Sequence, residues 1–339
     1  MKLTLISSIT EDYRDLRYFL KSLTEQDNQD FEIILCLNKS SNNKRIFDVI
    51  QEHYEFFGSR LKFLVNSRRE SIQYTLANAF ALAKGEYVTV LNSDTTIKKY
   101  LVREISTYAS DLDVDILEFK PRMIGSIAWK PHPRIENVNT RIKIADSPDI
   151  IAYSFPFIFN KIYKKSLIKK LIKFKPSTVT DTKLAIELNY RLLLLSKTYS
   201  YIDIRIKREY FGVDNWINPH SFITKFDALE PFFKTSDRKL MHEFNYAKYF
   251  FIKIFLAGLL TDTNYRNINT IMNYKQVLEK RSHKFKDKLK EIIKKYESSN
   301  EYKIFCETNI YMQFDNTETN WLRNSNPINK WNKILGELE

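Results

Sequence analysis

Asn92, Ser93 and Asp94 are polar residues that follow directly on an apolar stretch, and their side chains are of types that bind ligands. The stretch begins at Gly85 and continues as Glu-Tyr-Val-Thr-Val-Leu, a run that predicts a buried strand. In an open α/β sheet, ligands bind just beyond the carboxyl ends of the strands. The sequence therefore predicts that Asp94 lies where the chemistry of the protein takes place.

Strands and helices are expected to alternate through the first 120 residues and so to position this strand end. Apolar runs predict strands at residues 2–8, 31–37, 61–65 and 114–119. Apolar residues at helical spacing predict helices between them, one marked by Leu16, Phe19, Leu20 and Leu23, one by Ile72, Leu76, Phe80 and Ala83, and one over residues 98–109. Gly85 is expected to act as a C-cap of the second helix. This alternation predicts a parallel sheet with right-handed crossovers.

The rest of the chain divides into an irregular segment, a helix followed by a strand, and a helical tail. Residues 120–149 hold Gly125 and four prolines without clear periodicity, which favours irregular structure. A helix is expected over residues 183–195 and a strand over residues 199–206. Residues 275–296 form a basic amphipathic pattern in the tail. Such a helix packs on its own domain, and the alternative is contact with an anionic membrane surface.

Composition limits the classes of partner and compartment. The net charge of +13, from 54 basic and 41 acidic residues, favours anionic partners. No aromatic and basic recognition strand is present, so a nucleic-acid partner is not expected. Cys36 and Cys306 provide neither a disulfide framework nor metal-ligand spacing, which fits a reducing compartment. The longest apolar run, residues 249–260, is interrupted by Lys253 and is too short to span a bilayer, and the N-terminal apolar run is too short for a signal peptide. We therefore expect a cytoplasmic protein.

Two motifs resemble those of family 2 glycosyltransferases, which are inverting, nucleotide-sugar-dependent enzymes of the GT-A fold. Residues 85–94 resemble the strand that ends in the Asp-X-Asp motif, and residues 159–168 resemble an Asn-Lys-(Ile or Leu)-Tyr-Lys signature that opens a helix after the acceptor loop. The resemblance covers about residues 1–212. It implies an α/β fold with a mostly parallel, Rossmann-like sheet flanked by helices over residues 1–219. Residues 220–339 are expected to form an α-helical C-terminal region for acceptor binding, membrane contact or oligomerisation.

The resemblance also implies how the donor would be held. In the family, the motif's last aspartate helps to hold a divalent cation that neutralises the leaving sugar diphosphate. Asp94 is the corresponding ligand for Mn2+ or Mg2+, and Asn92 is a weaker, neutral one. Ser8, Asn38 and Ser93 are the further residues expected at the nucleotide sugar, for which a UDP-sugar is the first expectation.

Several donor positions depart from the family pattern. Leu37 and Asn38 stand where the family has two aspartates. The Asn38 amide oxygen could accept the uracil N–H without charge assistance, and the alternative is an ordinary turn residue. On the helix that follows Arg69, the family usually carries an Arg-Asn pair and a glycine, and this chain has other residues there. Arg68 and Arg69 either bind phosphate in place of that arginine or are simply solvated.

On the acceptor side, the resemblance implies contacts by Trp129, Lys161 and Tyr163, and the alternative for Trp129 is ordinary anchoring of its loop. Asp181 corresponds to the family's general base, which removes the acceptor hydroxyl proton while the anomeric carbon is attacked from the face opposite the diphosphate. The alternative for Asp181 is an N-cap of the helix expected from residue 183.

These observations favour an inverting glycosyltransferase of the hexosyltransferase type that builds a cell-envelope glycan, glycolipid or polymer in a bacterial cell. The alternative is a catalytically degenerate relative that binds a nucleotide, a glycan or a partner glycosyltransferase. The enzyme is preferred because Asp94 and Asp181 are both retained. We expect it in the cytoplasm or on the inner face of the cell membrane, with the C-terminal helices available for a homo-oligomer.

Overall fold

The computed structural model describes residues 2–9, 12–38, 43–68, 70–171, 174–178, 182–212, 217–236, 238–262 and 272–339, without the side chains of residues 262 and 272–282. The chain divides into two compact units. The first consists of Met1–Arg122, Ile135–Ser147 and Phe157–Tyr210, and the second of Met123–Arg134, Pro148–Pro156 and Phe211–Glu339. Two internal segments of the first 219 residues thus belong with the C-terminal region, which itself begins at Phe211.

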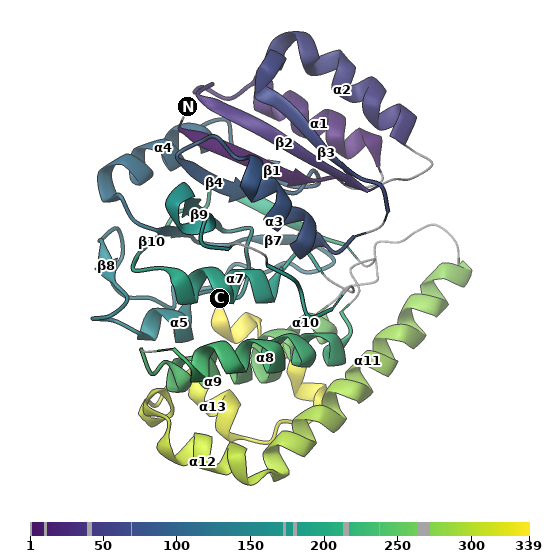
Figure 1. Ribbon diagram of the computed structural model, residues 1–339. Coiled ribbons are helices and arrows are strands. Elements are labelled where there is room, and N and C mark those ends of the chain that lie inside the picture. The colour runs from purple at the N-terminus through teal and green to yellow at the C-terminus, as the bar shows by residue number, and fades with distance from the viewer. Residues whose placement is uncertain are drawn as a thin grey trace. The chain divides into compact units, whose positions relative to one another are not determined.

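The first unit is built on a mostly parallel sheet flanked by helices (Figure 1), which confirms the predicted fold class. Within the described chain, the strand order is β3-β2-β1-β4-β9-β6-β10-β8. The strands are β1 (Leu3–Ser8), β2 (Phe31–Asn38), β3 (Leu61–Asn66), β4 (Tyr87–Val90), β6 (Ile116–Phe119), β8 (Ile142–Lys143), β9 (Lys161–Lys164) and β10 (Thr198–Ile202). Strands β1 to β4 run parallel, whereas β9 runs antiparallel to both β4 and β6. Outside this sheet, β5 (Thr96–Ile97) pairs antiparallel with β11 (Lys207–Phe211).

The helices of the first unit cover both faces of the sheet. They are α1 (Tyr13–Thr24), α2 (Asn43–Phe57), α3 (Ile72–Leu82), α4 (Leu101–Leu112), α6 (Lys165–Ile168) and α7 (Ile186–Leu195). Buried stripes of α1, α2 and α4 share one core with alternate residues of β1, β2 and β4. On the opposite face, Phe80 of α3 packs against Tyr163 of β9, with ring centroids 6.4 Å apart. This tilted contact of the two rings joins α3 to the sheet.

Several strands and helices of the first unit have simple physical reasons in the local sequence. β2 is a continuous apolar run that is buried from Phe31 to Leu37, as expected of a strand covered on both faces. α1 begins after the N-cap residue Asp12, whose carboxylate accepts a hydrogen bond from the backbone N–H of Arg14. α3 begins in the same way after Ser71, whose hydroxyl accepts from the N–H of Tyr74.

Gly85 does not cap α3, which is a correction to the sequence prediction. The C-cap residue of α3 is Ala83, in an extended conformation. Gly85 instead lies against β1, where an added Cβ would be 2.6 Å from the backbone nitrogen of Thr4. The glycine is therefore required by a close approach of two backbones.

We expect Gly85→Ala to lower the free energy of unfolding by about 1–3 kcal/mol, the usual cost of overpacking. Chemical denaturation of the variant would measure this loss. Gly336→Ala is the matched control, because a Cβ at Gly336 meets no atom within 4 Å. Equal stability of the two variants would contradict the close approach at Gly85.

Three predicted boundaries also differ from the structure. The expected helix start at residues 159–168 is wrong, because these residues form β9 and only then the short helix α6. The helix expected from residue 183 begins at Ile186, after Ala185 in a left-handed conformation. The strand expected over residues 199–206 ends at Ile202, and a separate strand, β11, follows it.

The second unit is mainly helical. Its elements are β7 (Met123–Gly125), α5 (Asp149–Tyr153), α8 (Pro219–Lys234), α9 (Met241–Tyr249), a π-helix (Phe250–Phe255), α10 (Leu256–Asp262), α11 (Met272–Ser298), α12 (Asn300–Thr308) and α13 (Thr317–Arg323). The apolar run of residues 249–260 is buried and forms its central helical stretch. Lys253 within this run is satisfied by Glu297, at 2.8 Å, and by the carbonyl oxygen of Leu322, at 2.7 Å. The run is therefore a core helix.

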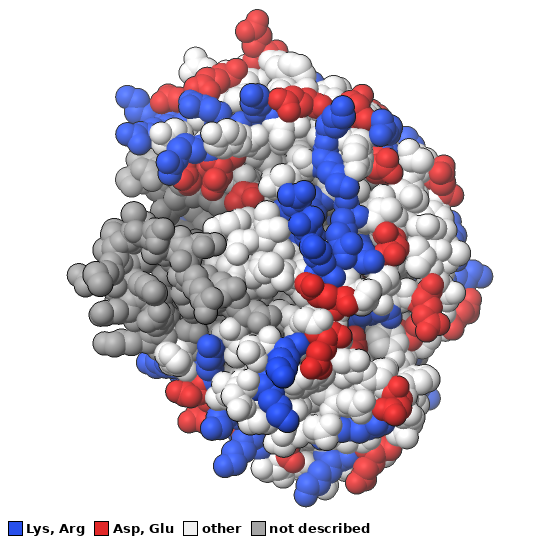
Figure 2. Space-filling model, turned by 180° about the vertical axis from the view of Figure 1, so that it is seen from behind, with Lys and Arg blue, Asp and Glu red and all other residues white. Residues whose placement is uncertain are grey.

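The amphipathic helix α11 packs through its apolar stripe. Leu289 and Ile293 are buried, whereas Lys290, Lys294 and Lys295 are exposed. This agrees with the packed helix that was preferred from the sequence. No helix in the described ranges is long and apolar enough to cross a membrane. On the face seen in Figure 2, basic side chains are interspersed with acidic ones.

Candidate active site

Asp94 lies just beyond the carboxyl end of β4, as predicted. The segment after β4 stays beside β1, because the N–H of Leu91 donates to the carbonyl of Ile6 at 2.8 Å and the N–H of Ser93 donates to that of Ser8 at 3.3 Å. A tight turn follows, in which the N–H of Thr95 donates to the carbonyl of Asn92. Ser8, Asn92, Ser93 and Asp94 are thus brought together at one edge of the sheet.

Lys183 and Glu209 complete a buried ionic cluster with Asp94. The Lys183 ammonium lies 3.0 Å from Oδ2 of Asp94 and 3.1 Å from Oε1 of Glu209. It also donates to the carbonyl oxygen of Tyr210. The side chains of Lys183 and Glu209 are 7% and 1% exposed, so the ammonium joins two carboxylates away from bulk water.

Different elements deliver these three side chains. Lys183 precedes α7 in a turn that is anchored by a hydrogen bond from the N–H of Ile158 to the carbonyl of Leu184. Glu209 is carried by β11, whose pairing with β5 returns the chain to the residues that follow Asp94. The cluster therefore depends on contacts between residues far apart in sequence, 89 positions for Asp94 and Lys183 and 117 for Asn92 and Glu209.

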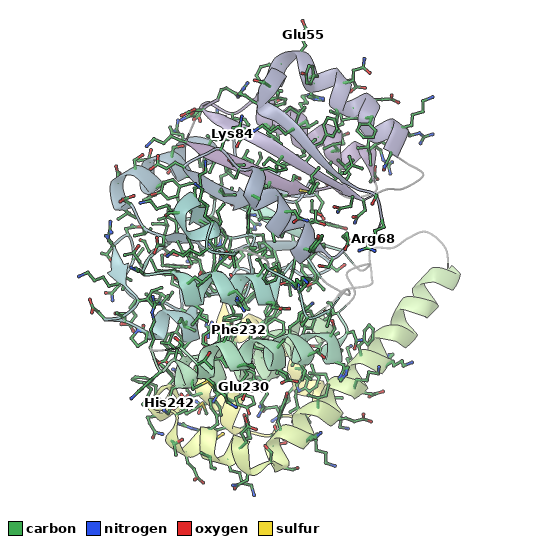
Figure 3. All side chains as sticks on the ribbon, in the orientation of Figure 1. Glu55, Arg68, Lys84, Glu230, Phe232 and His242 are labelled. Carbon is green, nitrogen blue, oxygen red and sulfur yellow. The ribbon has the colours of Figure 1, made fainter. Side chains whose placement is uncertain are left out.

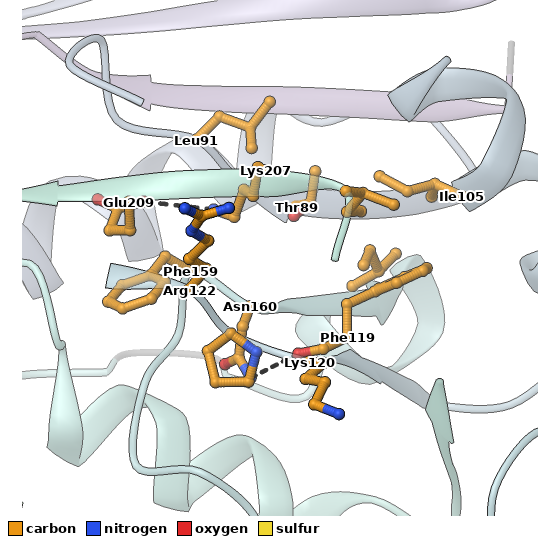
Figure 4. A pocket seen from close by; sticks show the side chains of 13 residues that line it. Thr89, Leu91, Ile105, Phe119, Lys120, Arg122, Phe159, Asn160, Lys207 and Glu209 are labelled. Carbon is orange, nitrogen blue, oxygen red and sulfur yellow. Dashed lines mark hydrogen bonds and ion pairs between the residues drawn. The ribbon is translucent and has the colours of Figure 1, made fainter. Parts of the chain in front are cut away.

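Glu209 is further surrounded by hydrogen-bond donors. Its Oε1 accepts from the Asn92 amide at 2.5 Å, and its Oε2 accepts from the Thr95 hydroxyl at 2.9 Å and lies 3.5 Å from the Lys207 ammonium. These donors favour the ionised carboxylate. Figure 4 shows Lys207 and Glu209 side by side. Glu209 is therefore the centre of the cluster.

Burial and charge act in opposite directions on these groups. Burial raises the pKa of Asp94 to about 6, although Lys183 favours the carboxylate. Burial also opposes ionisation of Glu209, but Lys183 and Lys207 outweigh it and lower the pKa of this carboxyl group. Burial disfavours the charged form of Lys183, yet Glu209 and Asp94 together raise its pKa. When Lys207, which lies 3.5 Å from Glu209, is counted with these three residues, two carboxylates face two ammonium groups and the formal charge is zero.

One oxygen of Asp94 has no hydrogen-bond partner among the residues that the structure describes. This oxygen, Oδ1, is buried, whereas Oδ2 of the same carboxylate is paired with Lys183. A buried acceptor without a donor costs about 1–3 kcal/mol. Such an atom beyond the end of β4 is suited to accept a hydrogen bond from a bound ligand.

The residues at Asp94 do not fit the divalent cation that the family resemblance implies. The ammonium of Lys183 already lies against Oδ2, and a metal ion on that carboxylate would meet its positive charge. The Asn92 amide directs its nitrogen, not its oxygen, to Glu209. The neutral cluster has no excess negative charge to attract a dication. Within the part of the chain that the structure describes, no group of three or more His, Cys, Asp or Glu residues is placed to hold a metal.

A small cavity lies beside the cluster (Figure 4). Its free space of about 10 Å³ is close to the minimum for one water molecule. Lys207, Glu209 and Arg122 line it together with apolar residues that include Leu91 and Phe119. It is too small for a sugar nucleotide, so it is part of the packing beneath the site.

Asn38 lies at the end of β2, near the same edge of the sheet. Its Oδ1 accepts from the Asn66 amide at 2.9 Å and from the N–H of Glu70 at 3.4 Å. Both lone pairs of the amide oxygen are thereby used, which favours the turn-residue alternative over a contact with uracil. Arg68 lies at the periphery (Figure 3), with 82% of its side chain exposed and its guanidinium on Glu70. Arg69 is outside the described residues.

Lys161 and Tyr163 lie in the interior of the sheet. Lys161 is fully buried, with its ammonium 3.2 Å from Oε2 of Glu118 and 2.8 Å from the carbonyl oxygen of Phe157. Burial lowers the pKa of Lys161 to about 8, although Glu118 favours the ammonium. The Tyr163 hydroxyl donates to Asn189 at 3.3 Å. These placements give both residues packing roles, and the proposed acceptor site does not include them.

Trp129 is buried in the second unit. Its indole N–H donates to the carbonyl of Leu335 at 3.1 Å, and its ring packs against Phe155 and Phe255. The indole therefore anchors the segment of residues 123–134, which agrees with loop anchoring and not with a sugar contact.

Asp181 lies outside the described residues, so its expected role as a base is not tested. Its alternative role depended on a helix that starts at residue 183, whereas α7 starts at Ile186 without a side-chain cap. Sequence reasoning missed Lys183 and Glu209. The available signal was a lysine two residues after Asp181 and a glutamate three residues after the strand expected over residues 199–206, which is too common to single out.

Comparisons with known proteins agree with this fold. Residues 5–172 match the model of the family described as glycosyl transferase family 2. An uncharacterised glycosyltransferase from Methanocaldococcus jannaschii is 24% identical to the chain over 234 residues, which are 67% of this chain and 69% of that protein.

Solved structures share the architecture at low identity. S. aureus TarS 1-349 in complex with UDP has a TM-score of 0.62 and 13% identity, and the alignment covers 85% of this chain and 90% of that one. A mannosyltransferase from Pyrobaculum calidifontis, in complex with GDP-Man and Mn2+, has a TM-score of 0.53 and 11% identity, with coverage of 99% and 84%. The chain spans 55% of the longer TarS chain. These findings show that residues 5–172 match glycosyl transferase family 2 and that the chain has the fold of GT-A glycosyltransferases.

Proposed function

We propose that the protein is an inverting glycosyltransferase that moves a sugar from a nucleotide-diphosphate sugar to a hydroxyl group of a glycan, glycolipid or polymer of the cell envelope. The observation that carries the proposal is the Asp94 carboxylate beyond the end of β4, whose buried Oδ1 accepts no hydrogen bond from any described residue. In a fold of this class, that edge of the sheet is where the donor binds.

Asp181 is the proposed general base. It would take the proton from the acceptor hydroxyl while the hydroxyl oxygen forms a bond to the anomeric carbon and the diphosphate leaves from the opposite face. Support comes from the family position of Asp181 and from its place two residues before Lys183, which contacts Asp94. The proposal assigns no step to a divalent cation.

The donor is proposed to be a UDP-sugar, because TarS structures hold UDP and UDP-GlcNAc and have higher TM-scores than the structure that holds GDP-Man. The family resemblance and the basic composition support the remaining parts of the proposal. These are hexosyl transfer, an acceptor in the cell envelope, peripheral contact with an anionic membrane, and self-association through the C-terminal helices.

Nucleotide binding tests the proposal. We expect UDP to stabilise the protein against heat more than GDP, CDP or TDP, because a ligand that binds only the folded state adds about 2.7 kcal/mol at 100 times its Kd. Differential scanning fluorimetry measures the shift, and Asp94→Ala should reduce it. Lys99→Ala, an exposed change in the same unit, is the control. No shift with any of the nucleotides would favour the alternative, a degenerate protein that binds a glycan or a partner.

A further inference from the structure

We propose that the Lys183 ammonium occupies the position between Asp94 and Glu209 that a divalent cation would take, and that this protein binds its nucleotide without a metal ion. The second half of this inference rests on the proposed function. The first half concerns the protein alone.

The geometry of the cluster resembles that of a metal ion bound between two carboxylates. Lys183 meets one oxygen from each carboxylate at 3.0 and 3.1 Å, as a single positive centre shared by two anionic ligands. A lysine ammonium is a compact point charge, so it can fill this place without the planar geometry that an arginine requires. The main-chain carbonyl of Tyr210 takes another of its protons. These contacts hold the ammonium in position and leave it little freedom to move aside for a metal.

The charge balance leads to the same conclusion. Lys183 and Lys207 offset Asp94 and Glu209, so a dication would enter a cluster that is already neutral and would face an ammonium on the ligand carboxylate. An anionic diphosphate, in contrast, would meet no uncompensated carboxylate there. Lys183 thus supplies at Asp94 the positive charge that a metal ion would otherwise supply.

Removal of Lys183 should therefore create a metal site. In Lys183→Ala, Asp94 and Glu209 lose their shared cation and become two neighbouring carboxylates, which are the ligands that Mn2+ prefers. A titration with MnCl2 alone, followed by the electron paramagnetic resonance signal of free Mn2+, measures binding without any nucleotide. We expect binding at least about tenfold tighter in Lys183→Ala than in the wild-type protein. Lys183→Ala with Asp94→Ala should return to the wild-type curve.

Two further variants control for the loss of one positive charge and for unfolding of the alanine variant. Lys99→Ala removes the same unit of charge from an exposed site and should bind Mn2+ as weakly as the wild type. Lys183→Gln removes the charge with less change in volume and should behave like Lys183→Ala if the alanine variant unfolds. Saturable Mn2+ binding by the wild type that is lost in Asp94→Ala would overturn the proposal without any variant of Lys183.

The nucleotide arm uses UDP with the wild-type protein, in EDTA and in MnCl2. We expect the two dissociation constants to agree within about twofold. A requirement for Mn2+ would overturn the metal-free half of the inference. No binding of UDP in either buffer would count against the proposed function, and the Mn2+ titration would still decide the role of Lys183.

Discussion

Lys161→Met is expected to lower the free energy of unfolding of the first unit by about 3–5 kcal/mol. The substitution removes the ammonium that pairs with Glu118, and both side chains are wholly buried. The Glu118 carboxylate would keep its hydrogen bonds from Tyr199 and Asn160 but would lose its counter-ion in the interior. Scanning calorimetry should show a fall in melting temperature of about 6–20 °C for a unit of this size.

The double variant Lys161→Met with Glu118→Gln separates the pair from simple packing. Glutamine keeps an oxygen acceptor and removes the charge, so the double variant should recover much of the lost stability. The exposed pair Arg17–Glu52 is the matched control, and Arg17→Met should cost about 0–1 kcal/mol. A loss at Lys161 no larger than the loss at Arg17 would contradict a charged pair in the interior.

Asp181→Asn is expected to reduce kcat by a factor of about 10²–10⁴, which is the usual contribution of a general base. Asparagine cannot take the proton of the acceptor hydroxyl, but it is as good an N-cap as aspartate. The substitution therefore removes base chemistry while preserving a capping role. Transfer kinetics with a UDP-sugar and a cell-envelope glycan fraction would measure the loss.

Binding and stability measurements complete this test. Affinity for UDP and the melting temperature should be unchanged in Asp181→Asn, since a base acts on the acceptor. Asp111→Asn, a change at a carboxylate on the exposed end of α4, is the control for loss of one negative charge. Full turnover by Asp181→Asn would remove this residue as the base, and lost UDP affinity would assign it to the donor instead.

Much of the fold of the first unit could be predicted from local patterns. Apolar runs such as residues 31–37 can be satisfied only in a covered strand, and the stripe from Leu16 to Leu23 can be buried on only one face of a helix. Residues 161–164 were harder to predict. Their sequence shows no strand pattern, since two lysines flank the segment, and only pairing with β4 and β6 selects an extended conformation.

The sequence by itself determined the order of the central strands and helices along the chain, the strand that leads to Asp94, and the family that residues 5–172 match, because these depend on residue types at short spacing. The tertiary structure decided what Asp94 contacts. Lys183 reaches it from the turn before α7 and also pairs with Glu209 of β11, and nothing in their local sequence specifies that meeting. Charge neutralisation in a buried cluster depends on distance in space, and for this reason the sequence could predict the place of Asp94 but not its pairing with Lys183.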